Sequence, residues 1–367
     1  MPHDFPLDAT YHAARAQLVV PCDDLDAAIA FYTDQLGFRL HMIMPADAPR
    51  IAVMSGSGIT LRLERSADPA VPHALIRLHL AGDPECWPAG DDDVVVAPGG
   101  VRIERAGTGK PATPACTDVL IQQASDDAAW VDGRAGMHYR DLVPGRLGGA
   151  LIASHIRIPE GGPVADYVHY HRVGLQMIFC RRGWVKVVYE DQGPPFVMHA
   201  GDCVLQPPTI RHRVLESSAG LEVVEIGSPA EHETWRDHEL DLPNPDVRPQ
   251  RRFAGQRFVR HIAAEARWQN DTVAGIEFRD TGIAAATDGL ADVRVFRVVT
   301  DTESELTLPV GETCFLVVLK GHIRVRDRKQ VNHTLMVDDA CLVPAGANAG
   351  LAASAGSEYL QAVLPER

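Results

Sequence analysis

Two histidines stand one residue apart in the segment VHYHRVGLQ, at positions 169 and 171, and Gln176 follows five positions later. The surrounding residues predict a strand, and residues i and i+2 of a strand project from the same face. His169 and His171 can therefore bind one metal ion together. Gln176 begins the next apolar run, from which it can approach the same point.

A third histidine is expected to return to this point from another strand. The later segment GDCVLQPPTIRHRVLE holds Gly201, Pro207 and His212 in that order. Glycine and proline mark turns, which allow the chain to reverse before His212. Three histidines at this spacing favour a metal site over a set of unrelated structural histidines.

These segments resemble the two sequence motifs of the cupin superfamily. The first runs HxH, four residues, Gln, six residues, Gly, and the second runs Gly, five residues, Pro, four residues, His. The resemblance implies a jelly-roll β-barrel that binds one divalent metal through His169, His171, Gln176 and His212. Two positions depart from the family pattern, because Gln176 replaces the usual glutamate and Thr209 replaces the usual glycine.

The replacement of the usual glutamate by Gln176 changes the charge of the predicted site. A divalent metal with one carboxylate ligand carries a net charge of about +1, whereas neutral ligands leave it the full charge, which strengthens its attraction for an anionic, chelating substrate. The exchange also removes a potential catalytic base. Strand alternation from His212 predicts that Glu216 points inward as the acid or base. Ile178 and Cys180 share the parity of Gln176 and are candidates for the substrate pocket.

Other polar residues in this region are interpreted as structural. Glu190 and Asp191 have the pattern of a solvated hairpin turn. Five further histidines lack partners at motif spacing: His138, His155, His199, His232 and His238.

From residue 151 onward, short β-rich runs alternate with Gly, Pro, Asp and Ser, which predicts sandwiches or barrels. The predicted fold is mainly β, with two jelly-roll (cupin) barrels preceded by an α+β domain of vicinal oxygen chelate type. The second barrel offers no HxH motif, and Ala349 stands where the later histidine would fall, so we expect it to bind no metal. The predicted segments are a connector at 126–150, the metal-binding barrel at 151–228, a linker at 229–260 and the second barrel at 261–367.

Residues 10–125 are predicted to form the α+β domain. Strand-like runs flank the helical segment DLDAAIAFYTDQLGF, in which apolar residues recur at three- and four-residue intervals and Gly37 closes the helix. This βαβββ pattern resembles the opening module of the vicinal oxygen chelate superfamily, which includes glyoxalases and bleomycin-resistance proteins.

That superfamily places metal ligands on the first and last strands of each module. Carried over by position, the resemblance implies Gln17 and Glu64 as a second site, with His73 and Gln122 as loose candidates in the second half of the domain. The second half lacks a clear repeat of the helix signature, so we expect a degenerate domain used for packing or dimerisation.

Composition limits the partners. The 367 residues carry a formal net charge of -14, which disfavours nucleic acid and anionic membranes and leaves a small molecule as the expected partner. Seven dispersed cysteines without a C-x-x-C pair indicate neither a disulfide framework nor a zinc knuckle and fit a reducing cytoplasm. The N-terminus has no signal-peptide pattern.

Three functions remain open. The first is a mononuclear non-haem iron dioxygenase, because cupins with a neutral three-histidine set include thiol, diketone and aromatic-ring dioxygenases. The second is a non-redox enzyme, an isomerase, cyclase or lyase that uses the metal as a Lewis acid on a sugar acid or polyketide. The third is a non-catalytic metabolite sensor. Fusion to a vicinal oxygen chelate domain favours the first, and with it Fe(II) over Zn, Ni or Mn; a homodimer is expected from the resemblance alone.

Overall fold

The computed structural model describes residues 15–35, 37–56, 59–66, 75–79, 94–96, 102–105, 118–124, 130–306, 312–347 and 349–365. Two compact units divide the chain, one of residues 1–110 with 234–236 and the other of residues 111–233 with 237–367. No helix in the described part of the chain is long and apolar enough to cross a membrane.

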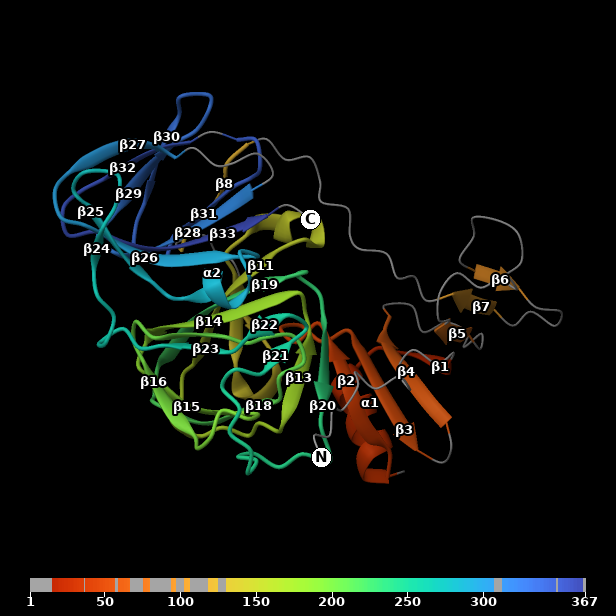
Figure 1. Ribbon diagram of the computed structural model, residues 1–367. Helices are drawn as coiled ribbons and strands as arrows, with labels where there is room; N and C mark the ends of the chain where they lie inside the picture. The colour runs from red at the N-terminus through yellow and green to blue at the C-terminus, as the bar shows by residue number, and fades with distance from the viewer. Residues whose placement is uncertain are drawn as a thin grey trace. The chain divides into compact units, whose positions relative to one another are not determined.

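The first unit packs one helix against a mixed sheet (Figure 1). The sheet order is β20-β2-β3-β4-β1-β5-β7-β6, with β1 parallel to β4 and β5 parallel to β7. Its elements are β1 (Arg15–Cys22), α1 (Leu25–Ala30), the π-helical turn η2 (Phe31–Gln35), β2 (Arg39–Met44), β3 (Ile51–Gly56), β4 (Ile59–Arg65), β5 (Leu75–His79), β6 (Val94–Val96), β7 (Arg102–Arg105) and β20 (Glu233–Arg236).

Local chemistry sets the ends of the helix. The Asp24 side chain accepts a hydrogen bond from the Ala27 amide and caps the first turn. Gly37 has a φ of 67°, in the left-handed region that glycine adopts without steric cost, and it ends the helical stretch as the sequence predicts. Leu25 packs into the core under the helix, together with Met54 and Leu63 of the sheet.

The second unit consists of two β-barrels (Figure 1). The elements of the first barrel are β9 (Val131–Asp132), η3 (Arg134–Gly136), β10 (His138–Asp141), η4 (Pro144–Gly149), β11 (Ile152–Ile158), β12 (Gly162–Pro163), β13 (His169–Arg172), β14 (Leu175–Arg182), β15 (Trp184–Tyr189), β16 (Phe196–His199), β17 (Cys203–Leu205), β18 (His212–Ser217), β19 (Leu221–Ser228), the hairpin β21 (Arg252–Phe253) and β22 (Gln256–Arg257), and β23 (Val259–His261). One of its sheets has the order β23-β17-β14-β19-β11-β10-β9, and the facing strands run β16-β15-β18-β13, with β12 paired to β18.

The second barrel repeats this plan with a seven-stranded sheet, β24-β25-β26-β33-β28-β31-β8, and a four-stranded sheet, β27-β32-β29-β30. Its elements are β8 (Leu120–Gln122), β24 (Gln269–Asn270), β25 (Ile276–Asp280), α2 (Ile283–Ala286), β26 (Asp292–Val298), β27 (Thr302–Leu306), β28 (Glu312–Lys320), β29 (Ile323–Arg326), β30 (Asn332–Leu335), β31 (Ala340–Val343), β32 (Ala349–Ala353) and β33 (Glu358–Pro365).

Strand alternation separates two cores in the first barrel. Met177 and Phe179 of β14 point outward into a core shared with the second barrel, which contributes Phe315 and Leu360. We call this shared set of buried side chains the interbarrel core. Residues of opposite parity form a second, interior cluster within the first barrel; it includes Cys180, Val185, Val187 and Tyr189, with Ile178 packed against it. The predicted mainly β fold, with two barrels that follow an α+β domain in the sequence, is confirmed.

The structure adds detail at the predicted joins. The segment 126–150 contains β9 and β10, which extend a sheet of the first barrel, and the segment 229–260 contains β20 to β22 and the first residues of β23. Gln122 does not lie in the α+β sheet, because β8 pairs with β31 of the second barrel. His73, the other loose ligand candidate, lies outside the described residues.

Candidate metal centre

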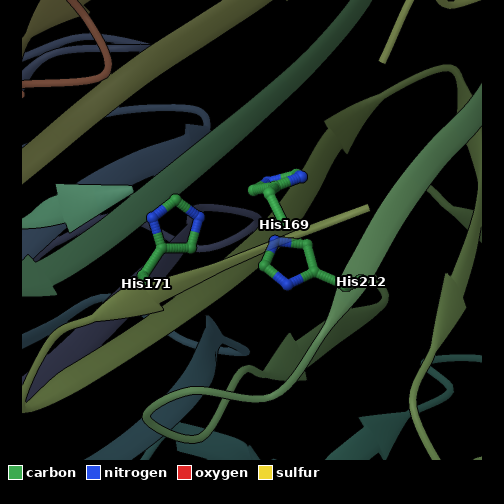
Figure 2. A group of neighbouring side chains, drawn as sticks. All are labelled: His169, His171 and His212. Atoms are coloured by element: carbon green, nitrogen blue, oxygen red, sulfur yellow. The ribbon is translucent and has the colours of Figure 1, made fainter. Parts of the chain in front are cut away.

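Three imidazole rings meet inside the first barrel (Figure 2). His169 and His171 lie on β13, and His212 begins β18, where it pairs directly with His169. One ring nitrogen from each lies within 4.8 Å of the other two, and all three side chains are buried. The strand pairing thus brings together the three histidines that the sequence motifs predict.

Backbone carbonyls fix the tautomers of two of these rings. His169 Nδ1 lies 2.8 Å from the carbonyl oxygen of Tyr167, and His212 Nδ1 lies 3.0 Å from that of Ile210. A carbonyl oxygen only accepts hydrogen bonds, so each Nδ1 carries the proton and each Nε2 keeps its lone pair. A histidine oriented in this way is the form that binds a metal.

Burial keeps the three imidazoles neutral at pH 7. It lowers the pKa of His212 to about 4. The pKa values of His169 and His171 fall well below the usual range, first because of burial and then because of neighbouring groups that include Arg134 and the other histidines. The site therefore needs no proton release from these rings before they can ligate a metal.

Arg134 reaches this centre from η3. Its Nη1 donates to Asp166 Oδ1 at 2.5 Å, and its Nη2 donates to His169 Nε2 at 2.6 Å. Asp166 is buried and also accepts from the backbone amides of Tyr167 and Val214. Although burial acts to lower the pKa of Arg134, the Asp166 carboxylate and other neighbours raise it, so the guanidinium stays charged. Sequence reasoning missed Arg134, because it stands 35 positions before His169 in the predicted connector and belongs to no motif.

Gln176 connects to the histidines through Gln206. The Nε2 of Gln206 donates to Gln176 Oε1 at 3.1 Å and lies 3.3 Å from His212 Nε2. Tyr189 Oη donates to Gln206 Oε1 at 2.7 Å, and the Tyr189 ring stacks on His212. Sequence reasoning also missed Gln206, although its place directly before Pro207 of the second motif put it near the site.

The hydrogen bonds show where the lone pairs of these side chains point. An N–H group of Arg134 meets the lone pair of His169 Nε2, and the Gln206 amide meets those of His212 Nε2 and Gln176 Oε1. A cation is attracted by the same lone pairs as an N–H donor. Neutral imidazoles with an amide oxygen form a donor set that suits a divalent transition metal, so the residues present fit such an ion.

The interpretation of Glu216 as an inward-pointing acid or base is wrong, because a bulge interrupts the strand. Val214 pairs with Val187, but after a register shift Glu216 pairs with Lys186. Directly paired residues project from the same face, so Glu216 shares the outer face with Lys186, opposite to the face of Val187. The alternation that predicted its direction does not extend across the bulge.

The two pocket candidates lie in the interior cluster of the first barrel. Burial, helped by Asp202, raises the pKa of the Cys180 thiol to about 12, which keeps it protonated and unreactive. Its sulfur lies 3.7 Å from the carbonyl oxygen of Gly183, at the turn after β14. Cys180 is four residues, about 13 Å of strand, from Gln176. Ile178 is two residues from Gln176 and lies on the same face of the strand.

Two structural interpretations from the sequence need correction. Glu190 and Asp191 are buried, and Arg251 contacts both at 2.6 and 2.7 Å, so they form an ion-pair cluster and not a solvated turn. His232 lies beside the centre, because its ring packs edge-on against His171 at 5.3 Å between centroids. Its Nδ1 bonds to the Pro229 carbonyl oxygen.

In the first unit, the register separates Gln17 from Glu64. Leu18 of β1 pairs with Leu61 of β4, which places Gln17 level with Thr60, four residues before Glu64. Arg62 lies between them on the same strand face and donates to Glu64 Oε1 at 2.5 Å. Among the described residues, the register therefore does not bring Gln17 and Glu64 level with each other.

Two family models match the chain. The cupin domain matches residues 154–227, and the Glyoxalase/Bleomycin resistance protein/Dioxygenase superfamily matches residues 14–104. No curated protein matches the chain in sequence.

Solved structures resemble the chain at low sequence identity. An oxalate decarboxylase formate complex from Lactobacillus farciminis aligns with a TM-score of 0.51 and 12% identity, over 67% of this chain and 86% of that chain. Oxalate decarboxylase from Bacillus subtilis gives 0.49 and 12%, over 67% and 76%. A mutant of salicylate 1,2-dioxygenase from Pseudoaminobacter salicylatoxidans gives 0.44 and 17%, over 59% and 70%. At 12% identity, the likeness to the first of these structures shows the fold and not the activity.

Proposed function

Because the chain joins a domain of the glyoxalase superfamily to a cupin domain with a buried three-histidine group, we propose that it is a metal-dependent cupin enzyme. The reaction that we propose is that of a mononuclear non-haem iron dioxygenase. Its substrate would be a small, anionic, chelating compound of aromatic or dicarbonyl type.

The observation that carries this proposal is the neutral ligand set. His169, His171 and His212 are buried and uncharged, and the fourth candidate, Gln176, is an amide. A divalent ion held by these residues keeps its full charge and attracts an anionic chelate more strongly than a centre with a carboxylate ligand. Bound Fe(II) would supply open positions at which a chelating substrate and O₂ can meet.

Arg134 supports an anionic substrate. Its guanidinium is held by Asp166 on one side and reaches His169 on the other, so it lies beside the candidate ligands. The buried Nε of Arg134 has no hydrogen-bond partner among the described residues, which leaves a donor for an incoming acceptor. We propose that Arg134 orients the substrate through a carboxylate oxygen.

The interior cluster supports a compact, largely apolar substrate body. Ile178, Val187 and Tyr189 belong to this cluster or pack against it, and Tyr189 stacks on His212. Apolar side chains beside a bound substrate would exclude water from it and strengthen the electrostatic contacts around it.

Oxygen uptake tests the proposal. Protein stripped with a chelator is reloaded separately with Fe(II), Zn, Ni or Mn, and O₂ consumption is followed with hydroxylated aromatic acids and with neutral 1,3-diketones. We expect uptake with iron alone. Turnover with zinc or nickel without O₂ would replace the proposal with the non-redox Lewis-acid function, and binding without turnover under any metal would favour the sensor function.

Arg134→Gln tests the orientation of the substrate. We expect KM for the carboxylate substrates to rise about 10- to 100-fold, the equivalent of one charge-assisted hydrogen bond, with a smaller change for the neutral diketones. Arg172→Gln is the matched control, because Arg172 is exposed and contacts Glu233 at 3.4 Å. Equal effects of Arg134→Gln on both substrate classes would contradict this role.

A further inference from the structure

A carboxylate that no motif identifies lies beside the candidate metal ligands. Glu225 stands on β19, where it pairs with Ile178 of β14 and with Ser154 of β11. Paired residues share a face, so Glu225 projects to the same side as Ile178, the side of the interior cluster. Its neighbour in register along β14 is Gln176, which pairs with Gly227 two residues further on.

Glu225 binds one end of the Gln176 amide. Gln176 Nε2 donates to Glu225 Oε1 at 2.5 Å. The other end, Oε1, faces Gln206 and accepts from its Nε2. Gln206 Nε2 also lies beside His212 Nε2, so the oxygen of Gln176 is the end directed toward the histidines.

The orientation of this amide decides whether it can bind a metal. Only the oxygen of a glutamine side chain can ligate a cation, and the NH₂ group at the other end only donates hydrogen bonds. A carboxylate is an acceptor without a donor when ionised, so Glu225 fixes the NH₂ group on its own side. It also polarises the amide and increases the electron density on Oε1, as partners behind a ligand do in metal sites.

We propose that Glu225 is the positioning residue that makes Gln176 an oxygen ligand. This inference rests on the proposed function. In the motif the carboxylate occupies position 176 itself, whereas here it stands one strand away and acts through the amide. The direct ligands then stay neutral, and Glu225 acts on them through the orientation of the Gln176 amide.

The test is metal affinity, measured with Co²⁺ on chelator-stripped full-length protein by competition with a chromophoric chelator and by the visible spectrum of the bound ion. Glu225→Gln is expected to weaken Co²⁺ binding about 10- to 100-fold. Glu222→Gln is the matched control, because Glu222 lies on the same strand but faces the other side, where it contacts His155 and Arg182. We expect the control to bind Co²⁺ as the wild type does.

Two further variants separate orientation from general electrostatics. In a Gln176→Leu background, Glu225→Gln should weaken Co²⁺ binding no further, because its effect passes through the amide. The exchange Gln176→Glu with Glu225→Gln moves the carboxylate to the ligand position and should restore affinity to within a few-fold of wild type, which also guards against a single variant that fails to fold.

An unchanged affinity in Glu225→Gln, or the same loss in the Gln176→Leu background, would overturn the assignment of Glu225 while leaving the metal centre in place. Absence of Co²⁺ binding by the wild type would instead overturn the proposed function and this inference with it. The two failures are therefore distinguishable.

Discussion

At the scale of single residues, the candidate centre depends on neutral donors held in one orientation. The carbonyl oxygens of Tyr167 and Ile210 fix the protons of His169 and His212 on Nδ1. The two charged groups beside them, Arg134 and Asp166, pair with each other. The histidine lone pairs thus meet in a buried place, and the charges of Arg134 and Asp166 beside it compensate each other.

The neutral state of His212 predicts a dependence of stability on pH. Its pKa is 6.5 when unperturbed and about 4 in the folded protein. Between these values the unfolded chain binds more protons than the folded chain, so stability falls as pH falls from 6.5 toward 4, by up to about 3 kcal/mol for this one group. Urea unfolding of chelator-treated His212→Asn at several pH values should show that much less acid destabilisation than the wild type.

If His212→Asn and the wild type lost stability in parallel between pH 6.5 and 4, the buried neutral state of His212 would be refuted.

At the scale of elements, β13 and β18 bring the histidines together, while the turns of the barrel hold these strands in register. Thr209, where the cupin pattern has glycine, has a φ of 67°, and its amide donates to the His171 carbonyl oxygen. A β-branched residue in this conformation is strained, and the surrounding structure must compensate. The turn between β14 and β15 uses Gly183, also at positive φ.

Gly183→Ala should destabilise the first barrel more than an ordinary glycine replacement. A Cβ on Gly183 would lie 2.3 Å from Ser218 Oγ, which accepts a hydrogen bond from the Trp184 amide. We expect a loss of about 2 to 3 kcal/mol of unfolding free energy from the left-handed conformation and the contact together. Urea unfolding gives the value.

Gly220→Ala isolates the conformational part, because Gly220 has a φ of 65° and a Cβ there would meet nothing within 4 Å. Its cost should be about 1 kcal/mol. Equal losses of unfolding free energy in the two alanine variants would show that the Ser218 side chain moves away from the new Cβ at no energetic cost.

Sequence reasoning reached the parts of this site that depend on local periodicity. The i, i+2 spacing placed His169 and His171 on one face, and motif spacing added His212. Contacts that depend on the pairing register could not be predicted from the sequence. Glu225 and Gln206 contact Gln176 only because strands that are distant in the sequence pair in the fold. Arg134 could not be found because no motif ties η3 to β13.

The errors have the same physical origin. A single extra residue in β18 places Glu216 on the opposite face of the strand from the one predicted. No residue type in HRVLES indicates that bulge. Similarly, Glu190 and Asp191 have the composition of a turn, and only the later segment that carries Arg251 buries them.

At the scale of the whole molecule, the fold gives unlike interiors to two similar barrels. They share the interbarrel core, in which Phe315 and Leu360 of the second barrel lie with Met177 of the first. The interior of the second barrel contains apolar side chains such as Phe296, Leu316 and Tyr359. Among the described residues, the group of histidines that could hold a metal lies in the first barrel.

The most direct test of the account is the metal content of the full chain. Chelator-stripped protein is reloaded with Fe(II) or Co²⁺ without oxygen, passed through a desalting column and analysed for metal per polypeptide, beside folded His169→Ala and His212→Ala variants. We expect one ion per wild-type chain and a content near zero in both variants, with circular dichroism unchanged. Metal retained by both variants, or no metal in the reloaded wild type, would contradict the central claim that these histidines form a metal centre.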